Sequence, residues 1–560
     1  MLHLETIIMK THPVCLLLSL LTVAHSSALS AYGAAAEPIA FPIKVAEGKH
    51  TFADAKGKPF FWLGTTQWEL FRGYSLEDAR ITLAKTRENG FTVVQVKLLG
   101  QGDGNRANVY GHKPLLNGDA LTPNEAYFTN VDAVVKSARD NNLAILMTVC
   151  HQSYRKNIPV DKARAWAKWL ATRYADAPNV LWSTTPEAKK ESLPFLREIA
   201  AGLREGDPLH RPISFKPDPA PAPSSSFINE EPWLDFNAMQ VWKWLEKIYP
   251  MLTADYALKP VKPTVMAEGA YEAGEEYGFA VTPLWVRRQA YYSYLAGGHH
   301  TYGHNDSWRI LPTWKQALDA PGARQMGILR KVFEARAEWW LLEPDQSLFA
   351  TGGKTEGRVL CLAARHRDGQ WAMFYLGDQV EFSVNLGKLS AAKLNAFWIS
   401  PADGKAIPLG PLSNQGVKSF TTPEGWEDAV LVLESPGGQA KPLSGAEAAA
   451  PPHAVPMVHA TDLFRPYNDP DDHWDLACVY ALAFQGRIDL KGVLIDFPPP
   501  ALHTDPDVSA VAQLNYLTGQ AVPALVGASR TISRDQAKDA ARQADLRGIR
   551  VIPVGHMGRV

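Results

Sequence analysis

Short apolar runs alternate with longer amphipathic stretches between about residue 41 and residue 345. The apolar runs have the length of strands, and the stretches between them repeat their apolar positions with helical spacing. The pattern predicts eight strands, at 60–68, 92–99, 144–150, 179–182, 212–216, 236–241, 263–269 and 299–304. Eight strands in alternation with helices are typical of a (β/α)8 barrel, so we predict an α/β fold of this kind for residues 37–345.

Three of the intervening helices are marked clearly by the sequence. The first begins at Ser75, with Asp78 three residues later in a capping-box pattern, and ends at Gly90. Two others are predicted over 160–175 and 283–298. The last helix carries two adjacent arginines at 287 and 288, and we expect at least one of them to lie on a solvent-exposed face.

The pattern changes after residue 345. Residues 346–436 contain short strand-like runs at close spacing, joined by turn sequences such as Asp368-Gly369 and Asp403-Gly404. This region is predicted to be an antiparallel β-sandwich. The sequence leaves open whether the sandwich packs on the barrel or holds a glycan.

The C-terminal part of the chain predicts a third structural unit. Residues 437–456 have the Pro, Gly and Ala content of a linker. Strand and helix patterns alternate again over 457–560. We interpret this segment as the first part of a doubly wound α/β domain.

The N-terminus has the features of a secretory signal peptide. Lys10 precedes an apolar run from Val14 to Ala24, and small residues follow through Ala36. The run is too short to span a membrane, and no other segment has the required length. We therefore predict a signal peptide over 1–36 and a secreted or periplasmic protein.

Composition narrows the possible partners. The 560 residues suggest two or three domains, and the net charge of -1 gives no basic surface for nucleic acid. Seventeen tryptophans would suit stacking on sugar rings. After signal removal, Cys150, Cys361 and Cys478 remain, and their spacing fits neither a disulfide framework nor a metal motif.

Candidate chemistry follows from the polar residues at the predicted strand ends, because barrel enzymes draw their catalytic groups from there. Glu268 ends the seventh strand and Glu187 follows the fourth. A glycosidase needs two such carboxylates, one as a proton donor and one as a base or nucleophile, about 5 Å apart in a retaining enzyme. The candidate substrate-binding residues are Trp68, Gln95, His151, Gln240, Tyr271, His304, Asn305 and Trp308.

Other interpretations of these residues remain open. Glu187 could simply begin a helix over 187–191, since acids favour helix N-termini. Glu268 and Glu272 could both be solvated loop residues, and Tyr271 could either hydrogen-bond Glu268 or only pack. The histidines at 151, 299, 300 and 304 could be structural, or could bind a metal, although their spacing fits no zinc motif.

Eight segments of the barrel region also stand in a characteristic order: PFFWLGTTQWELF, GFTVVQ, NVYGHKPL, TPNEAYFTNVD, NVLW, WLDFNAMQ, KPTVMAEGAYE and RRQAYYSYLAGGHHTYGHNDSW. In order and spacing they resemble the apiosidase-like glycoside hydrolases of family 140. The β-rich region that follows resembles the family's C-terminal domain, which is often labelled collagen-binding. The resemblance implies a (β/α)8 retaining glycosidase, with Glu268 as nucleophile and the acid/base at the end of the fourth strand.

The fourth strand departs from the family pattern. Family members tend to carry W-x-x-G-G-D, whereas this chain has Trp182-Ser183-Thr184-Thr185-Pro186-Glu187. Glu187 stands in the place of the aspartate. Its side chain is one methylene longer, so it could donate the same proton if its backbone lies slightly further from the substrate. Because both glycines are absent, the substrate need not be apiose.

A second group of acidic residues follows the linker. Asp462, Asp471 and Asp472 lie between a predicted strand and a predicted helix, and their oxygens would suit Ca²⁺. This segment resembles the N-terminal part of nucleoside-hydrolase-like proteins, in which such aspartates bind calcium and ribose. An ordinary turn is the alternative. We expect no independent activity from the segment, because only about a hundred residues of that domain are present.

The leading hypothesis is an exported retaining glycoside hydrolase that acts on plant or microbial polysaccharide, with Glu268 as nucleophile, Glu187 as acid/base and no cofactor in the barrel. One alternative is a nucleoside-hydrolase-type N-glycosidase activity of the C-terminal segment. Another is a carbohydrate-binding barrel without catalysis. The sequence does not determine the sugar, the linkage or the oligomeric state.

Overall fold

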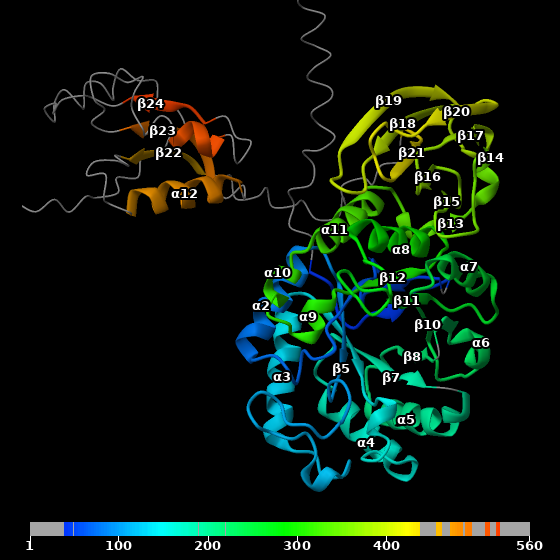
Figure 1. Cartoon of the computed structure of the whole chain (residues 1–560), viewed down its shortest axis with the longest axis vertical. Helices are drawn as coiled ribbons and strands as arrows, with labels where there is room; N and C mark the ends of the chain where they lie inside the picture. Colours follow the sequence, from blue (N-terminus) through cyan, green and yellow to red (C-terminus); the bar gives the residue numbers. More distant parts are fainter. Residues whose placement is uncertain are drawn as a thin grey trace, which may run out of the picture. The chain divides into compact units, whose positions relative to one another are not determined.

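The computed structural model describes residues 38–436, except 49, 189 and 219, together with the segments 455–461, 471–484, 488–495, 510–515 and 522–526. The described residues up to 436 belong to one compact unit, and those from 455 onward belong to another. Figure 1 shows the elements of both units.

The first unit contains a closed barrel of eight parallel strands, as predicted. The strands are β4 (Leu63–Thr66), β5 (Val93–Lys97), β6 (Ala144–Thr148), β7 (Val180–Ala188), β8 (Ile213–Pro217), β10 (Phe236–Trp242), β11 (Thr264–Gly269) and β12 (His299–Tyr302). β12 pairs with β4, which closes the barrel. A short strand, β9 (Ala222–Pro223), pairs antiparallel with β10.

Helices follow the strands along the chain. They are α2 (Leu76–Glu88), α3 (Glu125–Asp140), α4 (Val160–Arg173), α5 (Leu193–Gly206), α6 (Ser225–Ile228), α7 (Ile248–Ala257), α8 (Pro283–Leu295), α9 (Asn305–Arg309), α10 (Trp314–Ala317) and α11 (Pro321–Glu334). The predicted cap of α2 is present, because the Ser75 hydroxyl accepts a hydrogen bond from the Asp78 N–H at 3.1 Å. The predicted helices over 160–175 and 283–298 correspond to α4 and α8.

A small N-terminal sheet closes the amino end of the barrel. It consists of β1 (Lys44–Val45), β2 (Phe52–Ala53) and β3 (Pro59–Phe60). Phe52 and Trp62 pack against barrel residues such as Phe236 in one apolar cluster. Because this end is filled with side chains, a substrate can enter the barrel only at the carboxyl ends of the strands.

His299 and His300 lie at the start of β12, on the closed side of the barrel. His299 Nε2 lies 3.1 Å from the His50 carbonyl oxygen. Burial lowers the pKa of His299 to about 4 and that of His300 to about 3. Both are therefore structural histidines. In the described part of the chain, no three His, Cys, Asp or Glu side chains form a cluster that could hold a metal.

The β-domain that follows is an antiparallel sandwich, as predicted. Its six-stranded sheet contains β13 (Leu342–Pro344), β15 (Cys361–His366), β16 (Trp371–Leu376), β21 (Ala429–Glu434), β18 (Lys393–Ile399) and β19 (Ala406–Ser413), in that order. Its three-stranded sheet contains β14 (Phe349–Thr351), β17 (Glu381–Asn385) and β20 (Val417–Thr421). The sequence pattern missed β19, which contains Pro408, Gly410 and Pro411. Proline is tolerated there because β19 lies at the edge of the sheet and, among the described strands, pairs with β18 alone.

The β-domain packs on the barrel through α8 and α11, which lie between them in Figure 1. Tyr291 of α8 stacks on Tyr375 of β16, with 4.6 Å between the ring centroids. Arg288 donates a hydrogen bond to the Gly377 carbonyl at 2.7 Å. One face of the β-domain is thus used for packing on the barrel, a role that the sequence left open.

Arg287 anchors this interface. Its guanidinium forms an ion pair with Asp428 at 2.7 Å, and the two side chains are 2% and 1% exposed. Tyr375 donates a further hydrogen bond to Asp428 at 2.6 Å. The expectation that Arg287 or Arg288 lies on a solvent-exposed face was wrong, because the β-domain covers this side of α8.

We expect Asp428→Ala to lower the free energy of unfolding by about 3 to 5 kcal/mol, because it leaves the Arg287 charge buried without its partner. Chemical denaturation of the mature protein, followed by tryptophan fluorescence, measures this loss. Glu427→Ala is the matched control, since Glu427 approaches the same guanidinium at 3.4 Å but is 67% exposed. The control should change stability by less than about 1 kcal/mol. Equal losses in the two variants would contradict the prediction.

The second unit contains a three-stranded parallel sheet of β22 (Val455–Thr461), β23 (Ile488–Ile495) and β24 (Ala524–Val526). The helix α12 (Asp471–Phe484) connects β22 to β23 and packs against the sheet. This arrangement fits the predicted start of a doubly wound domain. Asp462 lies outside the described residues, as do the side chains of Asp471 and Asp472, so the calcium site stays a prediction.

The predicted signal peptide, 1–36, also lies outside the described residues. Within the described ranges, none of the helices combines the length and the apolar composition that a membrane span needs.

Candidate active site

Glu268 lies near the carboxyl end of β11, at the open end of the barrel. Lys216, near the end of β8, forms an ion pair with Glu268 and donates a hydrogen bond to Gln240 Oε1 at 2.8 Å. The Lys216 side chain is 3% exposed, whereas the Glu268 side chain is 14% exposed. The carboxylate is therefore held by a buried ammonium group and still reaches solvent.

Tyr271 connects Glu268 to the first strand of the barrel. Its hydroxyl accepts a hydrogen bond from Trp68 Nε1 at 3.0 Å and lies near enough to Glu268 to feel the charge of that carboxylate. Burial, followed by the charge of Glu268, raises the pKa of Tyr271 well above its ordinary value. The ring lies edge-on to Trp308, with 6.2 Å between the centroids. Tyr271 thus packs in the site, as one of its two alternatives expected, and a hydrogen bond to Glu268 stays a prediction.

Two ammonium groups lie over the indole of Trp68. Lys97 Nζ is 4.7 Å from the ring centroid and Lys216 Nζ is 5.5 Å from it. Both lysines are buried. Cation–π contacts of desolvated ammonium groups are stronger than those at exposed sites, so this ring helps to hold both lysines in place.

Lys216 is not among the site residues that were predicted from the polar residues at the strand ends. The sequence showed only that a lysine ends the apolar run PISFK. A charged residue at the end of a strand that is buried on both sides is itself a signal, because a buried ammonium group needs a partner.

We expect Lys216→Met to reduce kcat by about 10²-fold on an aryl glycoside, because the Glu268 carboxylate loses the ion pair that orients it. KM should change much less. Steady-state kinetics of the purified variant measure the effect. Lys315→Met is the control, since the Lys315 ammonium also lies over an indole, 5.2 Å from Trp314, but on an exposed helix. Wild-type kcat in the Lys216 variant would contradict the prediction.

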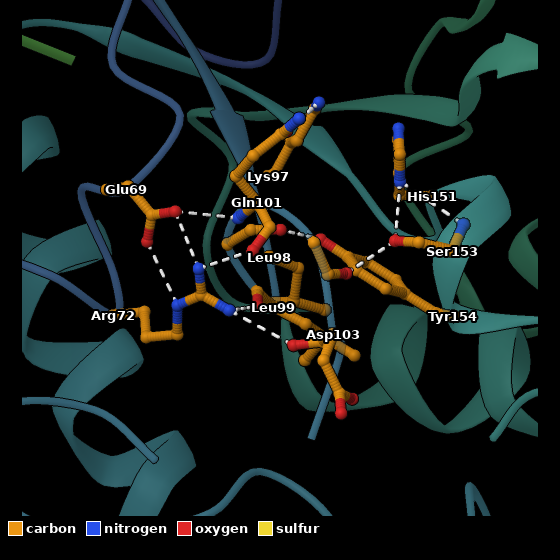
Figure 2. A network of polar contacts seen from close by, with 12 residues as sticks. Glu69, Arg72, Lys97, Leu98, Leu99, Gln101, Asp103, His151, Ser153 and Tyr154 are labelled. Carbon is orange, nitrogen blue, oxygen red and sulfur yellow. Dashed lines mark hydrogen bonds and ion pairs between the residues drawn. The ribbon is translucent and has the colours of Figure 1, made fainter. Parts of the chain in front are cut away.

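A polar network fastens the loop after β5, as Figure 2 shows. Arg72 forms an ion pair with Glu69 at 2.6 Å. Its guanidinium also donates to the carbonyl oxygens of Leu99 at 2.9 Å, Gln101 at 2.6 Å and Asp103 at 3.1 Å. Because one planar guanidinium serves all these acceptors, the loops after β4 and β5 are joined rigidly.

The other side of the same loop is held by the segment after β6 (Figure 2). His151 Nδ1 lies 2.7 Å from Ser153 Oγ, and this hydroxyl donates to the Gly102 carbonyl. Tyr154 donates to the Gly100 carbonyl. The contacts described for His151 thus place it in the support of the loop.

Gly100 makes this fastening possible. Its φ of +72° lies in the left-handed region, and a Cβ would lie 2.6 Å from Glu69 Oε2 and would overlap the Arg72 guanidinium. Only glycine therefore fits beneath the ion pair. The loop carries Gln101, whose side-chain oxygen accepts a hydrogen bond from Lys97. The network thus reaches the lysines over Trp68.

Glu272 does not join Glu268 at the barrel mouth. Its carboxylate is buried and accepts hydrogen bonds from the Tyr302 hydroxyl at 2.5 Å and from the Gly322 N–H at 3.1 Å. The interpretation of Glu272 as a solvated loop residue was wrong. It connects β12 to the start of α11 and has a structural role.

The remaining candidates are held by contacts within the protein. His304 caps α9 by accepting the Asp306 N–H at 3.1 Å, and burial lowers its pKa. Asn305 donates to Asp306 Oδ1 at 3.2 Å. Gln95 donates to the Ala267 carbonyl at 3.2 Å and so crosslinks β5 and β11 inside the barrel. Of the eight substrate-binding candidates, Trp68, Gln240, Tyr271 and Trp308 are connected to Glu268 through the contacts above, and substrate contact stays a prediction for all eight.

Glu187 lies in a strand. β7 continues to Ala188, well beyond the predicted 179–182, and Pro186 pairs with Lys216 in the ladder with β8. The short 3-10 helix η4 begins only at Lys190. The alternative that Glu187 begins a helix over 187–191 was therefore wrong. The Glu187 side chain lies outside the described residues, so its role stays a prediction, but its backbone runs beside the residue that binds Glu268.

Comparison with solved structures identifies the class of the protein. A structure titled "Glycoside hydrolase" is 27% identical, with a TM-score of 0.65, over 70% of this chain and 97% of its own. A glycoside hydrolase family 5 structure from Bacteroides vulgatus is 25% identical, with a TM-score of 0.65, over 71% of this chain and 94% of its own. With the barrel and the carboxylate at its open end, these likenesses define the protein as a glycoside hydrolase.

The family is shown by the sequence match. Residues 46–340 match the family described as "Apiosidase-like, catalytic domain", and the chain belongs to this family. Residues 344–434 match a domain described as "Putative collagen-binding domain of a collagenase". Among curated proteins, none matches the chain at a significant level. The two matched domains end before the C-terminal unit, whose likeness to nucleoside hydrolases stays a prediction.

Proposed function

We propose that the protein is an exported retaining glycoside hydrolase that cleaves a glycosidic bond in plant or microbial polysaccharide. Glu268 is the nucleophile and Glu187 is the acid/base. The observation that carries this proposal is the environment of Glu268. A partly exposed carboxylate at the open end of a barrel is held by the buried Lys216 ammonium.

The proposed reaction has two displacements. Glu268 attacks the anomeric carbon while Glu187 protonates the leaving oxygen, which forms a covalent glycosyl-enzyme. Glu187 then removes a proton from water, and the water oxygen displaces Glu268. Lys216 and Tyr271 orient the attacking oxygen throughout. This chemistry uses two carboxylates and water and needs no cofactor.

The loop before Glu187 and the predicted signal peptide both bear on the choice of substrate. The loop before Glu187 lacks the two glycines of the family pattern, so we do not restrict the sugar to apiose. Export is proposed from the N-terminal signal sequence, which would bring the enzyme to extracellular or periplasmic glycans.

The test is hydrolysis of a panel of aryl glycosides, including an apioside, by the purified mature protein. NMR of the first product should show the anomeric configuration of the substrate, because two inversions restore it. An inverted first product would refute the double displacement. Absence of turnover on every sugar, with glycan binding intact, would support the carbohydrate-binding alternative.

A further inference from the structure

A row of aromatic side chains leads away from the barrel mouth. It begins at Trp242, which pairs with Gly269 in the ladder between β10 and β11, one residue after Glu268. Successive ring centroids are 5.5 Å apart from Trp242 to Tyr277, 6.2 Å from Tyr277 to Phe279 and 4.4 Å from Phe279 to Trp285. Trp242, Phe279 and Trp285 are half-buried. We call these four residues the aromatic row. All of them except the buried Tyr277 leave part of their apolar surface open to solvent.

The start of the aromatic row is tied to the active site. The Tyr277 hydroxyl accepts a hydrogen bond from the Tyr271 N–H at 3.0 Å. The Tyr271 hydroxyl is hydrogen-bonded to Trp68, whose ring lies under the lysine that pairs with Glu268. Trp242 has a φ of +49°, an uncommon conformation for a bulky residue. Such a conformation persists only where the surrounding structure imposes it, often at binding sites.

The aromatic row ends at the β-domain. The guanidinium of Arg358, in the loop before β15, lies 5.9 Å from the centroid of Trp285. Arg358 is 60% exposed, and its Nε is 3.7 Å from Glu246 Oε2 on the barrel side. The row thus connects the catalytic carboxylate to the boundary between the two domains.

A hollow of about 560 Å³ lies at this boundary. On the barrel side it is lined by Glu246, Tyr249 and Thr253, and on the β-domain side by Gln346, Thr355 and Glu356. The volume falls within the range of small-molecule sites, about 300 to 1,000 Å³. The mixture of an aromatic ring, carboxylates, an amide and hydroxyls suits a sugar, which has apolar C–H faces and many hydroxyls.

Glu246 provides an independent indication of a ligand. Its Oε2 atom is shielded from solvent and forms an ion pair with the Arg358 Nε at 3.7 Å, but it accepts no hydrogen bond from the residues that the structure describes. The hydroxyl of a bound sugar could donate that hydrogen bond. The lining contains both signs of charge, the carboxylates of Glu246 and Glu356 and the ammonium of Lys247, and this balance favours a neutral sugar over a charged one.

We propose that the hollow between α7 and the β-domain is a distal binding site for a neutral glycan chain that extends along the aromatic row into the active site. This inference rests on the proposed glycosidase function and assigns the β-domain a share in substrate binding. The enzyme then acts on polymers, and remote sugar contacts contribute to the rate at the reacting bond.

The test compares a polymer with a small substrate. Arg358→Ala and Glu246→Gln should each lower kcat/KM on a neutral polysaccharide by about 10-fold, the effect of one charge-assisted hydrogen bond. Both should leave kcat/KM on the aryl glycoside unchanged. Arg367→Ala is the control, because Arg367 forms an exposed ion pair with Glu343 at 2.8 Å in the same domain. Wild-type activity of both variants on the polymer would overturn the inference.

A binding measurement separates this inference from the proposed function. Affinity electrophoresis in gels of arabinan, galactan or galactomannan, with Glu268→Gln as the parent protein, requires no hydrolysis. If Arg358→Ala abolishes binding and the wild-type protein hydrolyses no glycoside, the distal site is supported and the proposed glycosidase function is refuted. Binding that is unaffected by Arg358→Ala, or absent for every polysaccharide, would refute the distal site whether or not the enzyme is active.

Discussion

Glu268→Gln is expected to lower kcat on the preferred aryl glycoside by at least about 10³-fold, since removing a catalytic nucleophile has effects of this size or larger. Glutamine has nearly the same shape as glutamate and can still face Lys216 and Tyr271, so the loss would reflect chemistry. Steady-state kinetics measure the effect, and an unchanged denaturation midpoint would show that the fold is preserved.

The matched control for Glu268 is Glu275→Gln. Glu275 is an exposed glutamate in the loop that follows β11 and should be dispensable. A further variant, Glu268→Ala, opens space for azide, which should restore turnover and yield a glycosyl azide of inverted configuration, because only one displacement occurs. Near wild-type kcat in Glu268→Gln would exclude this residue as the nucleophile.

Glu187→Gln is expected to have the second largest effect, and the effect should depend on the leaving group. A general acid contributes about 10² to 10⁴-fold when the leaving oxygen needs a proton. Hydrolysis of a polysaccharide or an alkyl glycoside should fall by this factor, whereas formation of the glycosyl-enzyme from a dinitrophenyl glycoside should change little. Pre-steady-state release of dinitrophenol measures that first step directly.

The control for Glu187 is Glu191→Gln, because Glu191 is exposed and lies in η4 (Lys190–Ser192), just after β7. Azide should accelerate the Glu187→Gln variant on the dinitrophenyl glycoside and yield a product of retained configuration. A uniform loss of activity across all leaving groups would argue against an acid/base role. In that case the chain would have lost the aspartate of the family pattern, and Glu187 would not replace it as the proton donor.

The family resemblance and the fold lead to the same seventh-strand glutamate by separate routes. The motif KPTVMAEGAYE places Glu268 at a strand end, and the structure places it beside Lys216 and Tyr271. Neighbouring Glu272, which looked similar in sequence, faces the start of α11. The two glutamates are only four residues apart, but Glu268 is the catalytic candidate and Glu272 is a structural carboxylate.

The sequence by itself determined the order of the elements and singled out Glu268 as the candidate nucleophile. The barrel strands are apolar runs, the helix α2 is capped by Ser75, and Glu268 ends an apolar run. Such features depend on residues within a few positions of each other, because hydrophobic periodicity and capping are local. A strand that contains two prolines, such as β19, broke the local pattern and was recognisable only by its place at a sheet edge.

Only the tertiary structure decided which side chains meet. Lys216 reaches Glu268 across 52 residues of sequence, and Asp428 buries Arg287 across 141. Neither pairing has a local signal, because barrel closure and domain packing bring together strand ends and helix faces that are remote in the chain. The cost of burying a charge then requires the partner that the fold supplies. For this reason the sequence indicated where the active site lies, and the fold determined how its carboxylate is held.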